Sequence, residues 1–212
     1  AANCDVILLG QVHEISRTLP LIETLAHAHR WMSGTWAAPP AAFIRLGCEY
    51  EELARTLTGR YRYNLRNRHD RLAKVAPVTV ERITEASQVR DAMQDGLRIE
   101  AAAWKGDLGT AMNSDPKVAE FYIRLAERAA EHGWLQLTFL KVGDERVAFD
   151  YILRSGRALC GVKIGYDPKY HTYSPGNMLL NLILQEACSE GAAEYDFLGV
   201  DDEWKFDWTN ET

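Results

Sequence analysis

Residues 134–166 contain three strand-like runs separated by tight turns, and this pattern restricts the fold more than any other feature of the sequence. One turn falls at Gly143-Asp144 and the other at Ser155-Gly156, and both pairs suit short hairpin connections. Strands joined in this way are antiparallel neighbours. We therefore expect a three-stranded meander over residues 134–142, 146–154 and 158–166.

The flanking segments supply helices and two further strands. Before the meander, the pattern predicts a strand over 78–83, a helix over 87–104 and a second helix that begins at Asp115-Pro116. After it, the pattern predicts a helix over 175–190, which Gly191 ends, and a strand over 194–198. A meander followed by a helical crossover to another strand predicts an α/β (α+β) fold, with a mixed, mostly antiparallel sheet and helices on both faces.

The first 75 residues do not resemble a complete domain. We expect a strand over 5–12, a helix over 19–32, a short strand over 43–46 and a helix over 49–57. This is too few strands for a closed sheet. The chain also does not begin with Met, which suggests a segment of a longer protein.

Composition excludes several classes of protein. No apolar run reaches the 18 or so residues that span a bilayer, and no secretory signal is present. The cysteines at positions 4, 48, 160 and 188 form no C-x-x-C pair, so we expect reduced thiols, no metal site and a cytoplasmic location. The net charge of -6 argues against DNA binding.

The segment from Tyr166 to Met178 has the pattern of an anion site. A strand ends, a polar loop follows, and a helix begins with Ser174 at the N-cap, Pro175 at the first position and Gly176 at the second. Free amides in the first turn of a helix, together with its dipole, attract phosphate, and Gly176 has no side chain to keep a phosphate away. On local evidence alone, a capped core helix that binds nothing is the more common explanation of the same residues.

Several motifs together resemble a known family. They are Glu100-Ala-Ala-Ala-Trp-Lys-Gly106, Asp115-Pro116, Gly165-Tyr-Asp-Pro-Lys-Tyr170, Tyr173-Ser-Pro-Gly176, Tyr195-Asp-Phe-Leu-Gly199 and the late Lys205-x-x-Trp208. Over most of residues 60–208 the chain resembles GNAT-type acetyltransferases associated with cellulose and exopolysaccharide synthesis (the CelD/BcsL type). These are distant relatives of the Fem-type peptidyltransferases.

The resemblance implies an acyltransferase that uses acetyl-CoA or another acyl-CoA and needs no metal. In GNAT folds the loop and helix start after the splayed central strand hold the CoA pyrophosphate, a role that would fall here to Tyr173, Ser174, Gly176, Asn177 and Met178. This segment departs from the glycine-rich phosphate loop of most GNAT proteins. The resemblance also implies two related halves, with residues 1–75 ending the first half and residues 76–212 forming a second, truncated one.

Acyl transfer needs a group to remove a proton and donors to hold the thioester oxygen, but no enzyme nucleophile. Asp150 lies in an apolar strand, where burial would raise its pKa; a solvated sheet face is the alternative. Tyr173 is a candidate to protonate the leaving thiolate, or else packs in the loop. Lys205 matches the family's late lysine, or else pairs with Asp201 or Asp202. A proton-carrying role for His171 competes with simple exposure.

The acceptor is the least defined part of the prediction. Glu100, Trp104 and Lys105 share one helix and are candidates to line an acceptor pocket, although Trp104 also suits a core anchor. A small molecule or a saccharide is the expected acceptor.

The stretch from Arg55 to Lys74 is strongly basic and carries Tyr61 and Tyr63 among its arginines. A solvated connecting helix, contact with CoA phosphates, contact with an anionic membrane and RNA binding all remain open. Two alternatives to the acyl-CoA enzyme follow: a Fem-like transferase that uses aminoacyl-tRNA, and a non-catalytic GNAT-like binding module.

Overall fold

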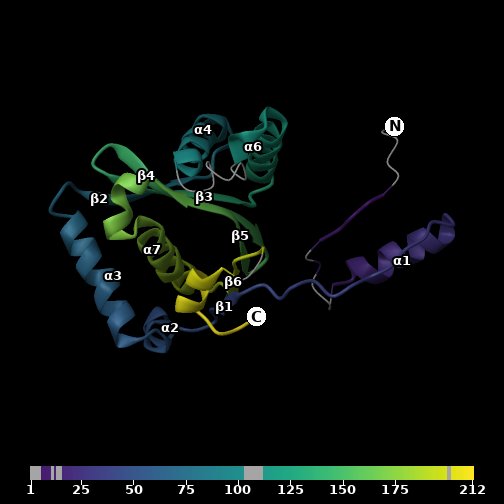
Figure 1. The fold of residues 1–212 in the computed structure, drawn as a ribbon, viewed down its shortest axis with the longest axis horizontal. Coiled ribbons are helices and arrows are strands. Elements are labelled where there is room, and N and C mark those ends of the chain that lie inside the picture. Colours follow the sequence, from purple (N-terminus) through teal and green to yellow (C-terminus); the bar gives the residue numbers. More distant parts are fainter. Residues whose placement is uncertain (1–5, 11, 13–15, 103–111, 200–201) are drawn as a thin grey trace.

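The computed structural model describes residues 6–10, 12, 16–102, 112–199 and 202–212. In these residues a single six-stranded sheet has the order β1-β6-β5-β4-β3-β2 (Figure 1). Every neighbouring pair is antiparallel except β5 and β6, which are parallel. The strands are β1 (Phe43–Arg45), β2 (Val78–Ile83), β3 (Leu135–Val142), β4 (Glu145–Ser155), β5 (Ala158–Tyr166) and β6 (Glu194–Asp196). The predicted meander and mixed sheet are confirmed.

Helices cover both faces of the sheet, as predicted. On one face lie α4 (Ala86–Ala102) and α6 (Pro116–Glu131), and on the other lies α7 (Pro175–Ser189). Outside α7 are α2 (Tyr50–Thr56) and α3 (Gly59–Leu72), the helix formed by the basic stretch. The remaining elements are α1 (Thr18–Ala28) and the short 3-10 helices η1 (Met112–Ser114), η2 (Pro168–Tyr173) and η3 (Glu203–Asp207).

The sheet separates two apolar cores, and β4 contributes to both. Phe149 and Tyr151 pack with α4 and α6, whereas Ala148 and Ile152 pack under α7. A strand covered on both faces is apolar almost throughout, as β4 is. Asp150 interrupts this pattern and is 0% exposed.

β5 separates from β6 partway along its length. The two strands pair only from Ala158 to Cys160, although β5 continues to Tyr166. Just beyond that point the register between β4 and β5 shifts, so that Ile152 pairs with Gly161 and Tyr151 with Lys163. Val162 is therefore a bulge residue, and bulges bend a strand and end regular pairing. We call the place where β5 and β6 part the fork.

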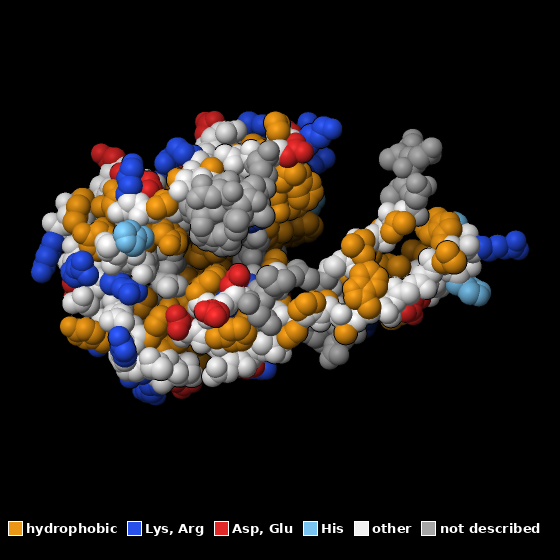
Figure 2. Space-filling view, viewed as in Figure 1, with side chains coloured by type: hydrophobic (Ala, Val, Ile, Leu, Met, Phe, Trp, Pro, Cys, Tyr) orange, Lys and Arg blue, Asp and Glu red, His pale blue; other side chains and the backbone are white. Residues whose placement is uncertain are grey.

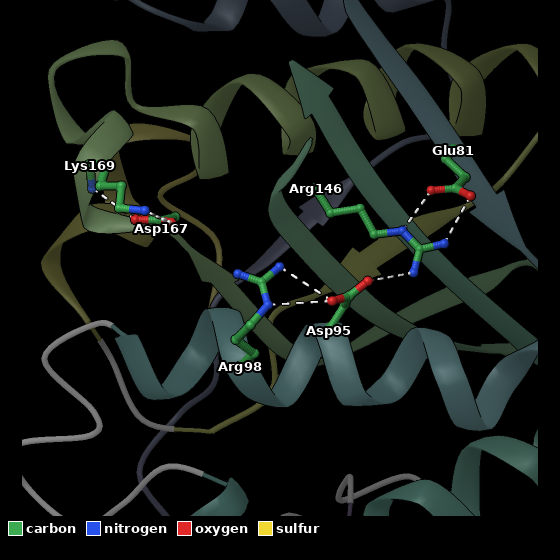
Figure 3. A network of polar contacts seen from close by, with 6 residues as sticks. All are labelled: Glu81, Asp95, Arg98, Arg146, Asp167 and Lys169. Atoms are coloured by element: carbon green, nitrogen blue, oxygen red, sulfur yellow. Dashed lines mark hydrogen bonds and ion pairs between the residues drawn. The ribbon is translucent and has the colours of Figure 1, made fainter. Parts of the chain in front are cut away.

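A network of charges fixes α4 to the sheet (Figure 3). Arg146 of β4 donates from Nε and Nη2 to the carboxylate of Glu81 on β2, at 2.7 and 2.8 Å, and from Nη1 to Asp95 of α4 at 3.0 Å. Its guanidinium also lies 4.4 Å from the centre of the Phe139 ring. Bidentate geometry of this kind is the strongest form of surface ion pair.

The N-terminal segment extends away from the body of the molecule (Figures 1 and 2). The strand expected over 5–12 is not present in residues 6–10, which form no regular structure. The apolar run Val6–Leu9 is instead exposed, at 52% or more for each side chain. Strand formation needs a partner strand, and residues 6–10 belong to none of the strands of the described sheet. In the described ranges, no helix combines the length and hydropathy needed to cross a membrane.

Candidate active site

The loop after β5 leads into α7 as the sequence predicts. Ser174 is the N-cap residue and Pro175 the first residue of the helix. Ser174 adopts the left-handed conformation, with φ 48 and ψ 57, and its side chain makes no hydrogen bond to the α7 amides. Within the described part of the chain, the amides of Gly176 and Asn177 have no hydrogen-bond acceptor. The first turn of α7 therefore retains free donors at the positive end of its dipole.

Two arginines of α3 lie against this helix start. Arg68 donates from Nη1 to the hydroxyl of Ser174 at 2.7 Å, and the Arg71 guanidinium lies 5.3 Å from the centre of the Tyr173 ring. Neither arginine forms an ion pair with a described residue. A cation beside the positive end of a helix is unfavourable on its own, but it becomes favourable when an anion lies between the two.

The other residues predicted to bind the acyl donor differ in how far their side chains are buried. Tyr173 ends η2 and is half-buried. Asn177 accepts a hydrogen bond from Trp208 Nε1 at 3.3 Å, and Met178 is 4% exposed in the core beneath α7. The side chains of Asn177 and Met178 therefore face the protein, whereas that of Tyr173 is only partly covered. His171 is exposed, with Nδ1 3.0 Å from the carbonyl oxygen of Pro168.

Asp150 is buried, which confirms one of the two predicted environments and excludes the solvated sheet face. Its Oδ2 accepts a hydrogen bond from the Tyr195 hydroxyl at 2.7 Å. Burial raises the pKa of Asp150 to about 7, although the bond from Tyr195 acts in the opposite direction. A base must reach the acceptor's proton, and Asp150 has no exposed surface in this structure.

Lys205 lies beneath the turn that follows β6. Its ammonium donates to the carbonyl oxygen of Leu198 at 2.9 Å and lies 3.6 Å from Asp202 Oδ2, so the predicted ion pair is present. The turn it supports has positive φ at Leu198 and Gly199, 50 and 69 respectively. Because Lys205 is 4% exposed, this contact explains why the sequence places a lysine there.

Glu100 occupies the opposite face of the sheet, at the end of α4. It is 0% exposed, and its Oε2 accepts a hydrogen bond from the Met112 amide at 2.7 Å. Its other oxygen lies 3.8 Å from Lys163 Nζ, and that ammonium lies 5.3 Å from the centre of the Tyr122 ring. Trp104 and Lys105 lie outside the described residues.

The sequence predictions missed three residues that the structure brings to this region. Arg68 belongs to a basic run in which nothing distinguishes it from its neighbours. Lys163 could have been noticed as a lysine inside an otherwise apolar strand. Tyr195 begins a motif that carried the family resemblance, but its partner Asp150 lies 45 positions earlier and only the fold unites them.

A groove of about 530 Å³ runs between α4 and α6. Its apolar lining includes Leu97, Ala101, Ala119 and Ile123. It contains none of the residues predicted to bind the acyl donor. In the part of the chain that the structure describes, no three His, Cys, Asp or Glu side chains converge in a way that could hold a metal ion.

Comparison with solved structures places this arrangement in a known fold. FemX has 13% sequence identity and a TM-score of 0.57, over 79% of this chain and 57% of FemX. A conserved protein of unknown function from Bacteroides thetaiotaomicron has 14% identity and a TM-score of 0.52, over 88% of this chain and 62% of that protein. The chain therefore spans less than two thirds of either structure, and at these identities the similarity concerns the fold alone. No curated protein matches the sequence significantly.

Residues 59–206 match the family model of the acetyltransferase (GNAT) domain. The match runs from α3, with its arginines, through the fork and α7 to the Lys205 segment. It covers well over half of the chain. On this match and the mixed sheet with its helix layers, the chain belongs to the GNAT acetyltransferase domain family.

Proposed function

We propose that this chain transfers an acetyl or longer acyl group from acyl-CoA to an amine or hydroxyl acceptor. The observation that carries the proposal is the start of α7, where free amides lie in the same turn as contacts from two arginines that have no acidic partner among the described residues. A pyrophosphate placed there would receive hydrogen bonds from the amides of Gly176 and Asn177 and positive charge from Arg68 and Arg71. It would also remove the unfavourable proximity of a cation to the helix dipole.

In this proposal, the thioester lies at the fork, next to the pyrophosphate site at the start of α7. Among the described residues, β5 has no strand neighbour on its β6 side beyond Cys160, and the bulge at Val162 turns its backbone out of the regular ladder. A backbone donor at this bulge can hold the thioester oxygen as it gains negative charge. The acceptor nitrogen or oxygen then attacks the carbonyl carbon directly, and the carbon–sulfur bond breaks.

Proton transfer completes the reaction. The acceptor loses a proton as its new bond forms, and the departing thiolate takes one up. Tyr173 is our proposed donor to the thiolate, because it directly precedes the helix start that would bind the pyrophosphate. Lys205 acts in this scheme by supporting the turn after β6, through its bond to Leu198.

The acceptor site lies, in this proposal, at the α4 end of the fork. Glu100 and Lys163 form a charged pair there, and Trp104 and Lys105 are the further residues that we assign to the acceptor site from the sequence. The resemblance to exopolysaccharide-associated acetyltransferases supports a saccharide or amino-sugar acceptor in the cytoplasm. Such an acceptor presents the hydroxyl and amine groups that this chemistry modifies.

Calorimetric titration with acetyl-CoA tests the donor site. We expect wild-type binding and a loss of about tenfold to a hundredfold in affinity for Arg68→Ala, the range for a hydrogen bond to a charged group. Arg66→Ala is the matched control, because Arg66 is exposed on the same helix and should change affinity less than about twofold. Equal loss in both variants would show general attraction to a basic helix, and no acetyl-CoA binding by the folded wild type would favour a non-catalytic binding module.

A second candidate function is aminoacyl transfer from tRNA, in the manner of the Fem-type enzymes. The observation that favours it is α3 itself, which continues beyond the pyrophosphate site as an exposed basic helix with Arg60, Arg66 and the 60%-exposed Tyr63. If the acceptor end of a tRNA lay at the pyrophosphate site, the tRNA backbone could contact the basic surface of α3. Filter binding of aminoacyl-tRNA over a range of salt concentrations checks this: tight binding that weakens steeply with salt, without acetyl-CoA binding, would replace the first proposal.

A further inference from the structure

One hydrogen bond connects the two strands that flank β5 at the fork. Tyr195 belongs to β6, and its hydroxyl reaches Asp150 of β4 at 2.7 Å. To do so the side chain must cross β5. It crosses at Gly161, where an added Cβ would lie 2.5 Å from the tyrosine hydroxyl oxygen. Any other residue at this position would exclude the tyrosine.

This crossing point coincides with the end of strand pairing. The last pair between β5 and β6 is Cys160 with Asp196, and Gly161 is the next residue of β5. The side-chain bond from Tyr195 to Asp150 therefore continues the connection between β6 and the rest of the sheet one residue past the last backbone pair. The bulge at Val162 follows immediately.

The same carboxyl group has a second oxygen without a partner. Asp150 Oδ1 is buried and accepts no hydrogen bond, and the buried hydroxyl of Thr138 is also without a partner. These two residues are direct cross-strand partners in β3 and β4, so their side chains lie next to each other on one face of the sheet. The two atoms are not in hydrogen-bonding geometry with each other, so Oδ1 has no donor to stabilise a negative charge, and the neutral acid is the form of Asp150 that this site favours.

Among the described residues, no other charged group contacts Asp150 to stabilise its ionised form. The α7 residues buried over this face are apolar, and they include Leu180, Ile183 and Leu184. Tyr195 is the titratable group that faces Asp150, and Asp196 and Cys160 lie near enough to raise the pKa of that tyrosine further. Further along β4, Arg154 forms an ion pair with Glu190 rather than with Asp150.

We propose that Asp150 is a positioning residue of the transferase: it holds a proton, accepts a hydrogen bond from the Tyr195 hydroxyl, and thereby fixes the point at which β5 and β6 part. This inference rests on the proposed function, because the fork is where the acyl thioester would lie. Loss of the proton leaves a buried charge with a single hydrogen bond, which weakens the connection across β5. Donor binding should therefore depend on the proton at Asp150.

Infrared spectroscopy tests the proton directly, with no donor present. The difference spectrum between wild type and Asp150→Asn should contain the carbonyl band of a protonated carboxylic acid at pH 6, and this band should disappear as the pH rises above 8. Asparagine is neutral at every pH and keeps an oxygen that can accept from Tyr195. Absence of the band throughout this range would overturn the assignment of the proton.

Calorimetry and hydrogen exchange test the positioning role. For Tyr195→Phe we expect acetyl-CoA affinity to fall by about fivefold at pH 6, and the Cys160 and Asp196 amides to exchange faster. Wild-type affinity should weaken from pH 6 to pH 8, whereas Asp150→Asn should show no such change beyond that of the ligand itself. Tyr50→Phe is the matched control, because it removes a hydroxyl bonded to Asn181 on the other side of α7 and should alter neither readout.

The outcomes separate this inference from the proposed function. If wild type binds acetyl-CoA but Tyr195→Phe matches it in affinity, pH profile and exchange, the positioning role is wrong and the function stands. If wild type binds no acetyl-CoA, the proposed function is wrong. In that case the infrared band and the exchange of Cys160 and Asp196 still decide whether the proton and the bond fix the fork.

Discussion

The two faces of the central sheet differ in the partners that their acidic side chains have. On the α4 side, Arg146 contacts two carboxylates and Glu100 lies beside Lys163, so each acidic group has a basic partner. On the α7 side, Asp150 has only the phenol of Tyr195 and an unpaired threonine beside it. Opposite charges stabilise ionised carboxylates, whereas burial without a cation stabilises the neutral acid. The α4 side therefore fixes structure over a broad pH range, and the α7 side responds near neutrality.

The pKa shifts on the two sides have opposite signs, and so do their effects on stability. The hydrogen bonds from Arg146 lower the pKa of Glu81, so its contribution is present above the unfolded pKa and is lost as the solution becomes acidic. Burial raises the pKa of Asp150 to about 7 in the folded state, whereas an ordinary aspartate has a pKa of 3.8. The folded protein thus binds more protons between these values, and its stability falls as the pH rises through that window.

The largest expected effect is this loss of stability on the α7 side. A shift of about three pKa units corresponds to roughly 4 kcal/mol between pH 4 and pH 8. Urea unfolding of wild type and Asp150→Asn across this range measures it, because the difference between the two proteins should change by about that amount. A constant difference would show that Asp150 titrates alike in both states, and the comparison between the two faces would fail.

Removing the cation on the α4 side should give the next largest effect. Arg146→Met keeps the length and apolar stem of the side chain but leaves Glu81 without its partner, and we expect a loss of about 2–3 kcal/mol. Arg124→Ala is the control, because its pair with Glu120 is an exposed contact within α6 and should contribute less than about 0.5 kcal/mol. Chemical unfolding at pH 7 measures both, and equal losses would contradict a special role for the network in Figure 3.

Local signals in the sequence predicted most of the fold and only part of the site. Gly143-Asp144 and Ser155-Gly156 fixed the meander, and Ser174-Pro175 fixed the start of α7, because each signal acts within a few residues. The strand expected over 5–12 was wrong over residues 6–10, since a strand depends on a partner that local pattern does not reveal. Contacts such as Arg68 with Ser174, 106 positions apart, depend on how the elements pack and were not foreseen.

Substitutions of two glycines in β5 test the difference between the two faces of the sheet. Gly165 lies on the α4 side, and Gly161 lies on the α7 side. Gly165→Ala would place a Cβ 2.7 Å from Cε1 of Phe149 and 3.4 Å from Cα of Glu100 on the α4 side. We expect a loss of about 1–2 kcal/mol from overpacking, with no change in the pH dependence of stability. Gly161→Ala on the α7 side should displace Tyr195 and alter that pH dependence as well. Unfolding at pH 5 and pH 8 distinguishes them, and identical pH profiles would contradict the assignment of pH response to the α7 side.

The smallest expected effect on stability is that of a substitution at Gly176. Glycine at this position has a different explanation from glycine at positions 161 and 165. A Cβ at Gly176 would meet only the Tyr166 ring, at 3.5 Å, which is ordinary contact. Alanine also favours a helix over glycine, so Gly176→Ala should change stability by less than about 0.5 kcal/mol. Packing therefore does not require glycine here. A ligand that closely approaches the α7 amides would require it. Gly176→Trp should consequently abolish acetyl-CoA binding in calorimetry while far-ultraviolet circular dichroism shows an intact fold, and retained affinity in that variant would remove the phosphate from the start of α7.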